Sequence, residues 1–324
     1  MHDVAALAGV SHQTVSRVLN DFEGIRPETR ERVQAAIEEL GYRRNLAARA
    51  LVTGQTQTIG MIGPVVPDIG PLSTLHAIER SARAVGLHTI MTSTEPSPGA
   101  VRAALEFLLG RGIDALALAA QHREIIDAVQ AADPGIPVVH LLTGGSPAGQ
   151  SASIDQVAGA RLAMEHLLDL GHTRIQHVAG PQSYTEARLR ADTYRQIMAE
   201  RGLATLPIIE GDWTADSGFE AAVALEADAT AVFCGNDQMA FGLLHYLTEN
   251  GVSVPGDMSL VGFDDTSEAR HSVPPLTTVR QDFAAVGQLA VDLLAARLGR
   301  AEAPSAQTLE PELVVRYTTA PPRI

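Results

Sequence analysis

Apolar side chains recur every three or four positions along the first 42 residues, and this spacing predicts three short helices. Ser11 stands directly before the second helix, residues 12–19, where a serine hydroxyl can cap the helix. Pro27 opens the third at a position where a missing N–H is harmless, and Gly41 ends it. The pattern therefore indicates a small helical domain at the start of the chain.

From residue 59 onward the pattern changes to short apolar runs separated by amphipathic stretches of helix length. This alternation predicts parallel sheets whose strands are joined by helices. The expected strands form two groups, residues 59–66, 89–92, 115–119 and 137–142, then 175–179, 208–209, 231–234 and 259–263. Two later strands, 277–280 and 309–315, flank a helix at 284–298 and are expected to complete the earlier sheets. We therefore expect an α/β protein with two doubly wound subdomains.

Negative charge is concentrated outside the helical segment. The chain has 24 basic residues, all of them arginine, and 38 acidic residues, which gives a formal net charge of −14. The first 54 residues contain seven of each sign and are neutral, so the rest of the chain carries all of the net charge. Because phosphate repels such a body, any nucleic-acid binding is expected in the first segment.

Several function classes are disfavoured by missing signals. No apolar run reaches membrane-spanning length and the start has no signal-peptide pattern, so we expect a cytoplasmic protein without a membrane span. A single cysteine, Cys234, excludes an internal disulfide and is expected to be buried. Phosphate-binding, dinucleotide-binding and hydrolase motifs are absent, and His166, His172 and His177 are expected at the surface or at helix caps. We therefore expect neither an enzyme, nor a metal site, nor a cofactor.

Residues 3–20 read D-V-A-A-L-A-G-V-S-H-Q-T-V-S-R-V-L-N and strongly resemble the helix-turn-helix headpiece of the lactose repressor family. Later blocks also resemble the family, above all its founding member, and the likeness covers nearly the whole chain. These blocks are G-P at 180–181, A-R-L-R at 187–190, E-G-D-W at 210–213, N-D-Q-M-A at 236–240, G-F-D-D at 262–265 and P-L-T-T-V-R-Q-D-F at 275–283.

The resemblance implies a helix-turn-helix headpiece and a periplasmic-binding-protein-like core, whose two doubly wound parallel-sheet subdomains are joined by crossovers near Ile154, Asp282 and Glu310. The implied domains are a DNA-binding domain at 1–42 and a hinge helix with linker at 43–58. The core N-subdomain would comprise 59–154 plus 283–310, and the C-subdomain 155–282 plus 311–324.

For the headpiece, the resemblance implies binding of double-stranded operator DNA. Matched positions suited to phosphate are Ser11, Thr14, Ser16 and Asn20, and those suited to base edges are His12, Gln13 and Arg17. The matched hinge positions are Tyr42, Asn45, Ala48 and Leu51, and Leu51 corresponds to a leucine that wedges between central base pairs. Two positions depart from the family pattern, with His12 in place of a tyrosine and Arg26 in place of a capping serine. Family members dimerise, and because no heptad run follows the last strand we expect a homodimer.

For the core, the resemblance implies a sugar site. A sugar requires hydrogen-bond donors, carboxylate acceptors and an aromatic plate. The matched positions are Arg190, Trp213, Asn236, Asp264, Gln281 and Phe283, and Asp68 and Glu186 stand at two further positions of the expected site. Asp68, Glu186 and Leu142 depart from the family pattern, and the two added carboxylates favour a neutral sugar over sugar phosphates and acids.

We therefore expect a sequence-specific repressor that a small neutral sugar releases from a palindromic operator. Three alternatives stay open: a cytoplasmic solute-binding protein with the same two-lobed core, a regulator corepressed by a purine, and an enzyme such as a sugar kinase or dehydrogenase. The headpiece argues against the first, the G-D-W and A-R-L-R blocks against the second, and the missing nucleotide loops against the third.

Overall fold

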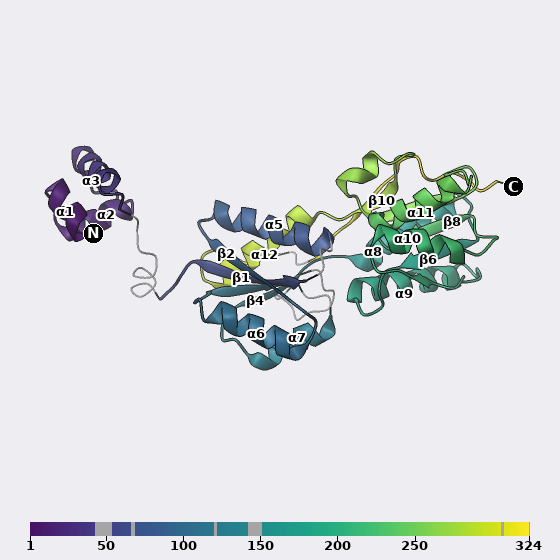
Figure 1. Ribbon diagram of the computed structural model, residues 1–324, viewed down its shortest axis with the longest axis horizontal. Coiled ribbons are helices and arrows are strands. Elements are labelled where there is room, and N and C mark those ends of the chain that lie inside the picture. The colour runs from purple at the N-terminus through teal and green to yellow at the C-terminus, as the bar shows by residue number, and fades with distance from the viewer. Residues whose placement is uncertain (43–53, 66–68, 120–121, 142–150, 306–307, 324) are drawn as a thin grey trace. The chain divides into compact units, whose positions relative to one another are not determined.

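The computed structural model describes residues 1–42, 54–65, 69–119, 122–141, 151–305 and 308–323. The chain separates into two units, Met1–Thr56 and Gln57–Ile324 (Figure 1). The first unit is helical, and the second contains two six-stranded sheets covered by helices. The expected fold class is therefore confirmed.

The helical unit forms as its sequence predicts, with helices α1 His2–Ala8, α2 His12–Leu19 and α3 Pro27–Glu39. The Ser11 hydroxyl accepts a hydrogen bond from the Thr14 N–H at 3.1 Å and thus caps α2. Arg26 precedes α3 without a capping hydrogen bond from its side chain, so the entry to this helix relies on Pro27. Buried residues of all three helices form one small core, which includes Val4, Val15, Val18 and Val33.

The first sheet of the second unit has the strand order β11-β5-β4-β3-β1-β2. Its strands are β1 Thr58–Pro64, β2 His88–Thr94, β3 Ala115–Leu118, β4 Val138–Leu141, β5 Ser151–Ile154 and β11 Thr308–Leu309. Helices α5 Ile69–Ala84 and α12 Phe283–Arg297 pack on one face, and α6 Pro98–Leu109 and α7 Arg123–Ala132 pack on the other (Figure 1).

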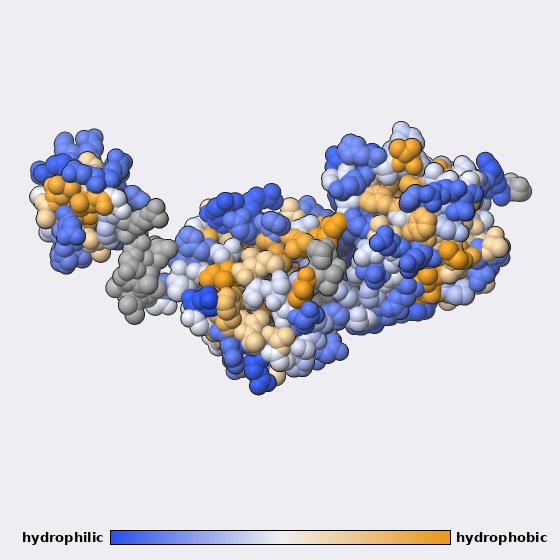
Figure 2. All heavy atoms as spheres, in the orientation of Figure 1, coloured by the Kyte–Doolittle hydropathy of each residue, from blue (hydrophilic) through white to orange (hydrophobic). Residues whose placement is uncertain are grey.

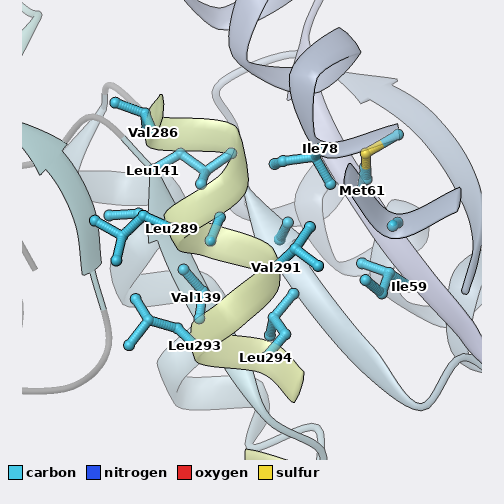
Figure 3. Close-up of a cluster of buried hydrophobic side chains, with 14 of the residues drawn as sticks. Ile59, Met61, Ile78, Val139, Leu141, Val286, Leu289, Val291, Leu293 and Leu294 are labelled. Carbon is cyan, nitrogen blue, oxygen red and sulfur yellow. The ribbon is translucent and has the colours of Figure 1, made fainter. Parts of the chain in front are cut away.

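Helix α12 provides much of the apolar core on its side of this sheet. Figure 3 shows its valine and leucine side chains directed toward Val139 and Leu141 of β4 and toward Ile78 of α5. The helix approaches α5 closely at Gly287, where a Cβ atom would lie only 2.4 Å from the Cβ atom of Ala77. Helix α12 comes after β6–β10 in the sequence, and so a segment near the end of the chain completes the core of the first sheet.

The second sheet has the strand order β12-β10-β9-β8-β6-β7, and all neighbours are parallel except β10 and β12. Its strands are β6 Ile175–Ala179, β7 Ile209–Glu210, β8 Ala231–Cys234, β9 Ser259–Asp264, β10 Thr277–Arg280 and β12 Glu312–Val314. Helices α8 Gln156–Asp169 and α9 Thr185–Glu200 cover one face. The other face is covered by α10 Ala215–Ala221, the 3-10 helix η1 Ala222–Ala224, α11 Asp237–Glu249 and the 3-10 helix η2 Ser267–Arg270.

The predicted strand at 309–315 is wrong, and β5 is a strand that the apolar pattern did not predict. The 309–315 segment is interrupted at Pro311, which has no N–H to donate, and it supplies β11 to one sheet and β12 to the other. Strand β5 reads S-A-S-I and is only four residues long. The chain passes between the sheets after β5, after β10, and between β11 and β12.

Figure 2 shows hydrophilic side chains interspersed with hydrophobic patches on the visible face of the molecule. Among the helices that the structure describes, none has the length and apolar character required to cross a membrane. No cluster of three or more His, Cys, Asp or Glu side chains that could hold a metal occurs among the described residues.

Three histidines were expected at the surface or at helix caps; His166 is half-buried near the end of α8, whereas His172 and His177 are buried. The buried His172 ring is within hydrogen-bond distance of the Thr230 hydroxyl, 2.9 Å, and of the Ala320 carbonyl oxygen, 2.8 Å. His177 lies in the middle of β6, where its ring stacks on Phe233 and its Nδ1 donates to the Phe233 carbonyl oxygen at 2.8 Å. Every residue of β6 is buried because helices cover both faces of the sheet.

His177 makes the fold sensitive to acid. Burial lowers the pKa of His177 from 6.5 to about 4. The unfolded chain therefore takes up this proton first, and stability present above pH 6.5 is lost as the pH falls toward 4, by about 3 kcal/mol. We expect denaturant unfolding to show a shallower loss over this range in His177→Leu than in the parent protein. Identical pH slopes in the two proteins would contradict the assignment.

Candidate functional site

Four neighbouring strands of the second sheet end at one edge, and three of them bring polar residues there. Gln281 follows β10, Asp264 ends β9, Asn236 comes shortly after β8, and Gly180 follows β6. These strands are parallel and adjacent, so their carboxyl ends meet at the same edge of the sheet. This is where open α/β sheets bind ligands.

The centre of this edge is the side chain of Arg190, which projects from α9 and is only 5 % exposed. Its Nε and Nη2 atoms donate to the Gln156 Oε1 atom at 2.9 and 2.7 Å, and its Nη1 atom donates to the Gly235 carbonyl oxygen. The guanidinium carbon lies 3.8 Å from the centroid of the Phe263 ring. Neutral acceptors and an aromatic face therefore hold the cation in place.

Carboxylates surround Arg190 without forming a salt bridge to it among the described contacts. Burial lowers the pKa of Arg190, and the nearby carboxylates of Asp264, Glu186 and Asp237 oppose this effect. Burial also raises the pKa of Asp237 to about 8, so this carboxyl is mostly protonated at neutral pH. The carboxyl groups of Asp264 and Glu186 therefore lie close enough to act on the charge of the buried guanidinium.

A second arm of the network runs through two glutamines. The Gln156 Nε2 atom donates to the Gln281 Oε1 atom at 2.8 Å, and the Gln281 Nε2 atom donates to Asp264 Oδ1 at 2.6 Å. Gln156 begins α8 directly after β5, and Gln281 follows β10, so both lie where the chain passes between the sheets. Sequence reasoning missed Gln156, although its place beside the expected crossover at Ile154 was a usable signal.

Trp213 forms the aromatic wall of the site. Its carbonyl oxygen accepts a hydrogen bond from the Asn236 Nδ2 atom at 3.0 Å, which helps to hold a left-handed backbone with φ of 74°. Asn236 also caps α11, because its Oδ1 accepts from the Met239 N–H at 2.9 Å. The half-buried indole lies against Gly180, and the ring of Tyr184 meets it edge-on at 5.8 Å.

Gly180 sets the position of this indole. A Cβ atom on Gly180 would lie 2.1 Å from the Trp213 ring, so Gly180→Ala must displace the ring. We expect a loss of about 1–3 kcal/mol in stability and a shifted emission maximum from Trp213, the only tryptophan. Gly99→Ala is the matched control, because its Cβ meets no atom within 4 Å. Unchanged emission in Gly180→Ala would contradict this placement.

The remaining sugar-site predictions have different outcomes. Glu186 is buried on α9, near enough to Arg190 to influence its charge. Phe283 begins α12 and packs against the apolar core of the first sheet, with its ring 3.3 Å from where a Gly70 Cβ would lie. Asp68 and Leu142 lie outside the described residues. The structure thus gathers six predicted residues at one edge: Glu186, Arg190, Trp213, Asn236, Asp264 and Gln281.

The predicted DNA-binding residues lie along α2 and its two ends. Ser11, His12, Gln13, Arg17 and Asn20 are exposed, whereas Thr14 and Ser16 are half-buried. The ring of His12 stacks on that of His2 at 4.8 Å, and the Asn20 Nδ2 atom donates to the Ser16 carbonyl oxygen at 2.8 Å. Tyr42 packs against the core of the helical unit, and the hinge positions Asn45, Ala48 and Leu51 lie outside the described residues.

Comparison with protein families gives two matches. Residues 1–45 match the model for bacterial regulatory proteins of the lacI family, and residues 164–319 match a periplasmic binding protein-like domain. These two segments contain α2 and most of the edge built around Arg190.

Curated relatives and solved structures match nearly the whole chain. The lactose operon repressor of Escherichia coli K12 is 36% identical over 99% of this chain and 91% of its own length. The HTH-type transcriptional repressor PurR of Haemophilus influenzae is 33% identical over 97% and 96%. A solved structure of the lac repressor dimer bound to operator and the anti-inducer ONPF superposes with a TM-score of 0.87, at 34% identity and 98% coverage of both chains.

Proposed function

Because the chain belongs to the lacI family of bacterial regulatory proteins, we propose that it represses transcription and that a small neutral sugar releases it from a palindromic operator. Relatives of nearly equal length are named as transcriptional repressors, which favours a regulatory role over catalysis and a place in the cytoplasm. The proposed domains are the headpiece at 1–42, the hinge at 43–58 and a core of an N-subdomain and a C-subdomain.

One observation carries the sugar assignment, namely the buried guanidinium of Arg190. An arginine side chain has five N–H donors. Within the described part of the chain, Arg190 uses three of them in its hydrogen bonds to Gln156 and Gly235. The same edge contains the Asp264 carboxylate and the Asn236 amide, which accept and donate hydrogen bonds, and the partly exposed ring of Trp213. Fixed donors, acceptors and an aromatic plate suit the hydroxyls and the C–H face of a sugar.

The charge of the site favours a neutral effector. Two carboxyl groups, those of Asp264 and Glu186, lie near the buried guanidinium of Arg190. The chain outside the first 54 residues carries the net charge of −14. A sugar phosphate or sugar acid would add negative charge to this region, which is unfavourable in a poorly solvated site.

DNA binding is assigned to the exposed face of α2. Arg17 and Gln13 can each form two hydrogen bonds with a base edge, to guanine and adenine respectively, and His12 lies one position before Gln13. The hydroxyl groups of Ser11, Thr14 and Ser16 and the Asn20 amide are suited to phosphate. Leu51, Asn45 and Ala48 of the hinge complete the assignment by resemblance.

We assign the contact between the two chains of the dimer to a cavity of about 610 Å³ among the elements that cover the second sheet. Its lining is mainly apolar and includes Phe241, Leu244 and Thr248 of α11, and His271 and Val273 of the loop after η2. Val273 is 85 % exposed in the single chain, which is high for an aliphatic side chain. Such exposure is typical of a residue that contacts another protein. A second copy is the occupant that fits, since the lac repressor structure is a dimer on its operator.

A ligand screen on the full chain tests the proposal. The probes are lactose, cellobiose and ribose, then glucose 6-phosphate, adenine and guanine, with thermal unfolding and Trp213 fluorescence as readouts. A neutral sugar at 100 times its Kd should add about 2.7 kcal/mol of stability. Binding of a purine that tightens operator binding would instead establish the corepressed alternative.

A further inference from the structure

Helix α2 ends in a turn that brings Phe22 back over Arg17. Asp21 adopts a left-handed backbone with φ of 49°. The Asp21 N–H donates to the Val18 carbonyl oxygen at 3.1 Å, and the Phe22 N–H donates to the Arg17 carbonyl oxygen at 3.0 Å. This pair of hydrogen bonds is a Schellman motif at the end of a helix. The motif brings the side chain of its last residue, here Phe22, next to that of the residue five positions earlier, here Arg17. Accordingly, the Arg17 guanidinium carbon lies 5.3 Å from the centroid of the Phe22 ring.

The neighbouring chain holds this turn in one conformation. Arg30 of α3 donates to the Asp21 carboxylate at 3.0 Å and to the Phe22 carbonyl oxygen at 3.1 Å. Gly24 leaves room for the ring, because a Cβ atom there would lie 2.9 Å from Phe22. Phe22 remains 52 % exposed, so its position depends on these contacts more than on burial in the helical core. These contacts therefore fix an exposed aromatic ring beside Arg17.

This arrangement addresses a specific need of base recognition. An arginine reads guanine through two parallel hydrogen bonds, which require the guanidinium plane in one orientation. A long side chain on an exposed helix face otherwise samples many rotamers. The face of an aromatic ring attracts a guanidinium within about 6 Å of its centroid and thereby favours the rotamers that lie over it.

We propose that Phe22 is a positioning residue for base recognition, whose ring orients the Arg17 guanidinium for one guanine of each operator half-site. Phe22 need not touch the DNA for this role. The inference rests on the proposed function, since it assumes that α2 reads DNA. It implies that discrimination at the base read by Arg17 depends on Phe22, whereas affinity for random DNA does not.

The test uses the full chain and the duplex that it selects from a random pool. Affinities are measured for that duplex, for duplexes with each guanine replaced in turn, and for random DNA. We expect Phe22→Ala to weaken binding to the selected duplex about tenfold and to reduce discrimination at the base read by Arg17 by a similar factor. Phe22→Tyr, which keeps the ring, should retain discrimination, and Phe22→Leu, which keeps only apolar bulk, should lose it.

The matched control is Phe107→Ala. Phe107 on α6 is 43 % exposed, and the Arg111 guanidinium carbon lies 3.5 Å from its ring centroid. The substitution therefore removes the same kind of arginine–phenylalanine pair from a surface outside the headpiece. Operator affinity and base preference should be unchanged in this variant. Thermal unfolding of every variant checks whether the headpiece is still folded.

A double-mutant cycle separates positioning from other roles. In the Arg17→Ala background, Phe22→Ala should have no further effect on base preference or on operator affinity. A second loss of equal size, an equal loss on random DNA, or full activity of Phe22→Leu would each overturn the inference. If the unmodified protein selects no sequence at all, the proposed function itself fails, which is a different result from selection that survives Phe22→Ala.

Discussion

Arg190→Ala is expected to abolish the response to sugar and to lower the free energy of unfolding by about 3 kcal/mol. The substitution removes three hydrogen bonds and leaves the Gln156 Oε1 atom and the Gly235 carbonyl oxygen buried without their donor. It also removes the buried cation that lies near the carboxyl groups of Asp264 and Glu186. Loss of stability and loss of the ligand response should therefore occur together.

Two further variants give this prediction its controls. Arg195→Ala removes an arginine from the same helix that is half exposed and paired with Asp192, so stability and sugar response should change little. Arg190→Lys keeps the charge but cannot bridge Gln156 and Gly235 as a fork, so it should not restore sugar binding. The measurements are denaturant unfolding and titration of Trp213 fluorescence with the sugar that binds the parent protein. A normal titration curve in Arg190→Ala would remove Arg190 from the site.

Val273→Asp is expected to weaken operator binding at least 100-fold while leaving each chain folded. Val273 is 85 % exposed in the single chain, so the substitution removes no internal packing. In a dimer it would bury an unpaired carboxylate against the apolar lining of the cavity formed with Phe241 and Leu244. Two linked headpieces bind a palindrome far more tightly than one, because the second contact becomes intramolecular.

Val223→Asp is the control for this second prediction. Val223 is 73 % exposed on the same lobe but does not line the cavity, so its replacement should leave self-association unchanged. Analytical ultracentrifugation and operator titration are the two measurements. If Val273→Asp remains a dimer of normal operator affinity, the dimer contact lies elsewhere on the chain.

The parts of the fold that local chemistry determines were predicted from sequence. The helices of the headpiece follow from the spacing of Val15 and Val18 and from the cap at Ser11. Strand β8 is a continuous apolar run and β6 begins and ends in apolar residues, as expected where helices cover both faces of the sheet. Here the sequence pattern and the tertiary environment demand the same residues.

Other features depend on contacts between distant segments and gave no local signal. Strand β5 contains two serines, and its strand conformation comes from pairing with β4 and β11. His177 was misassigned because its polar ring suggests exposure, whereas its Nδ1 reaches the Phe233 carbonyl oxygen on the neighbouring strand. A short strand and a satisfied core histidine are both products of the assembled sheet.

The candidate site divides in the same way. Residues such as Arg190, Trp213 and Asp264 belong to blocks that resemble the family, so they were found from sequence. Gln156 lies outside those blocks, and its role depends on two partners, Arg190 and Gln281, that are 34 and 125 residues away. Hydrogen bonds over such separations become visible only in the folded chain.

The most direct test of the account is the mutual effect of sugar and operator. Operator affinity is measured with and without saturating sugar, and sugar affinity, followed through Trp213, is measured with and without operator. If sugar bound at Arg190 controls the headpieces, each ligand must weaken the other by the same factor, on the order of 5- to 150-fold. A sugar that saturates the Trp213 signal and leaves operator affinity unchanged would contradict the account.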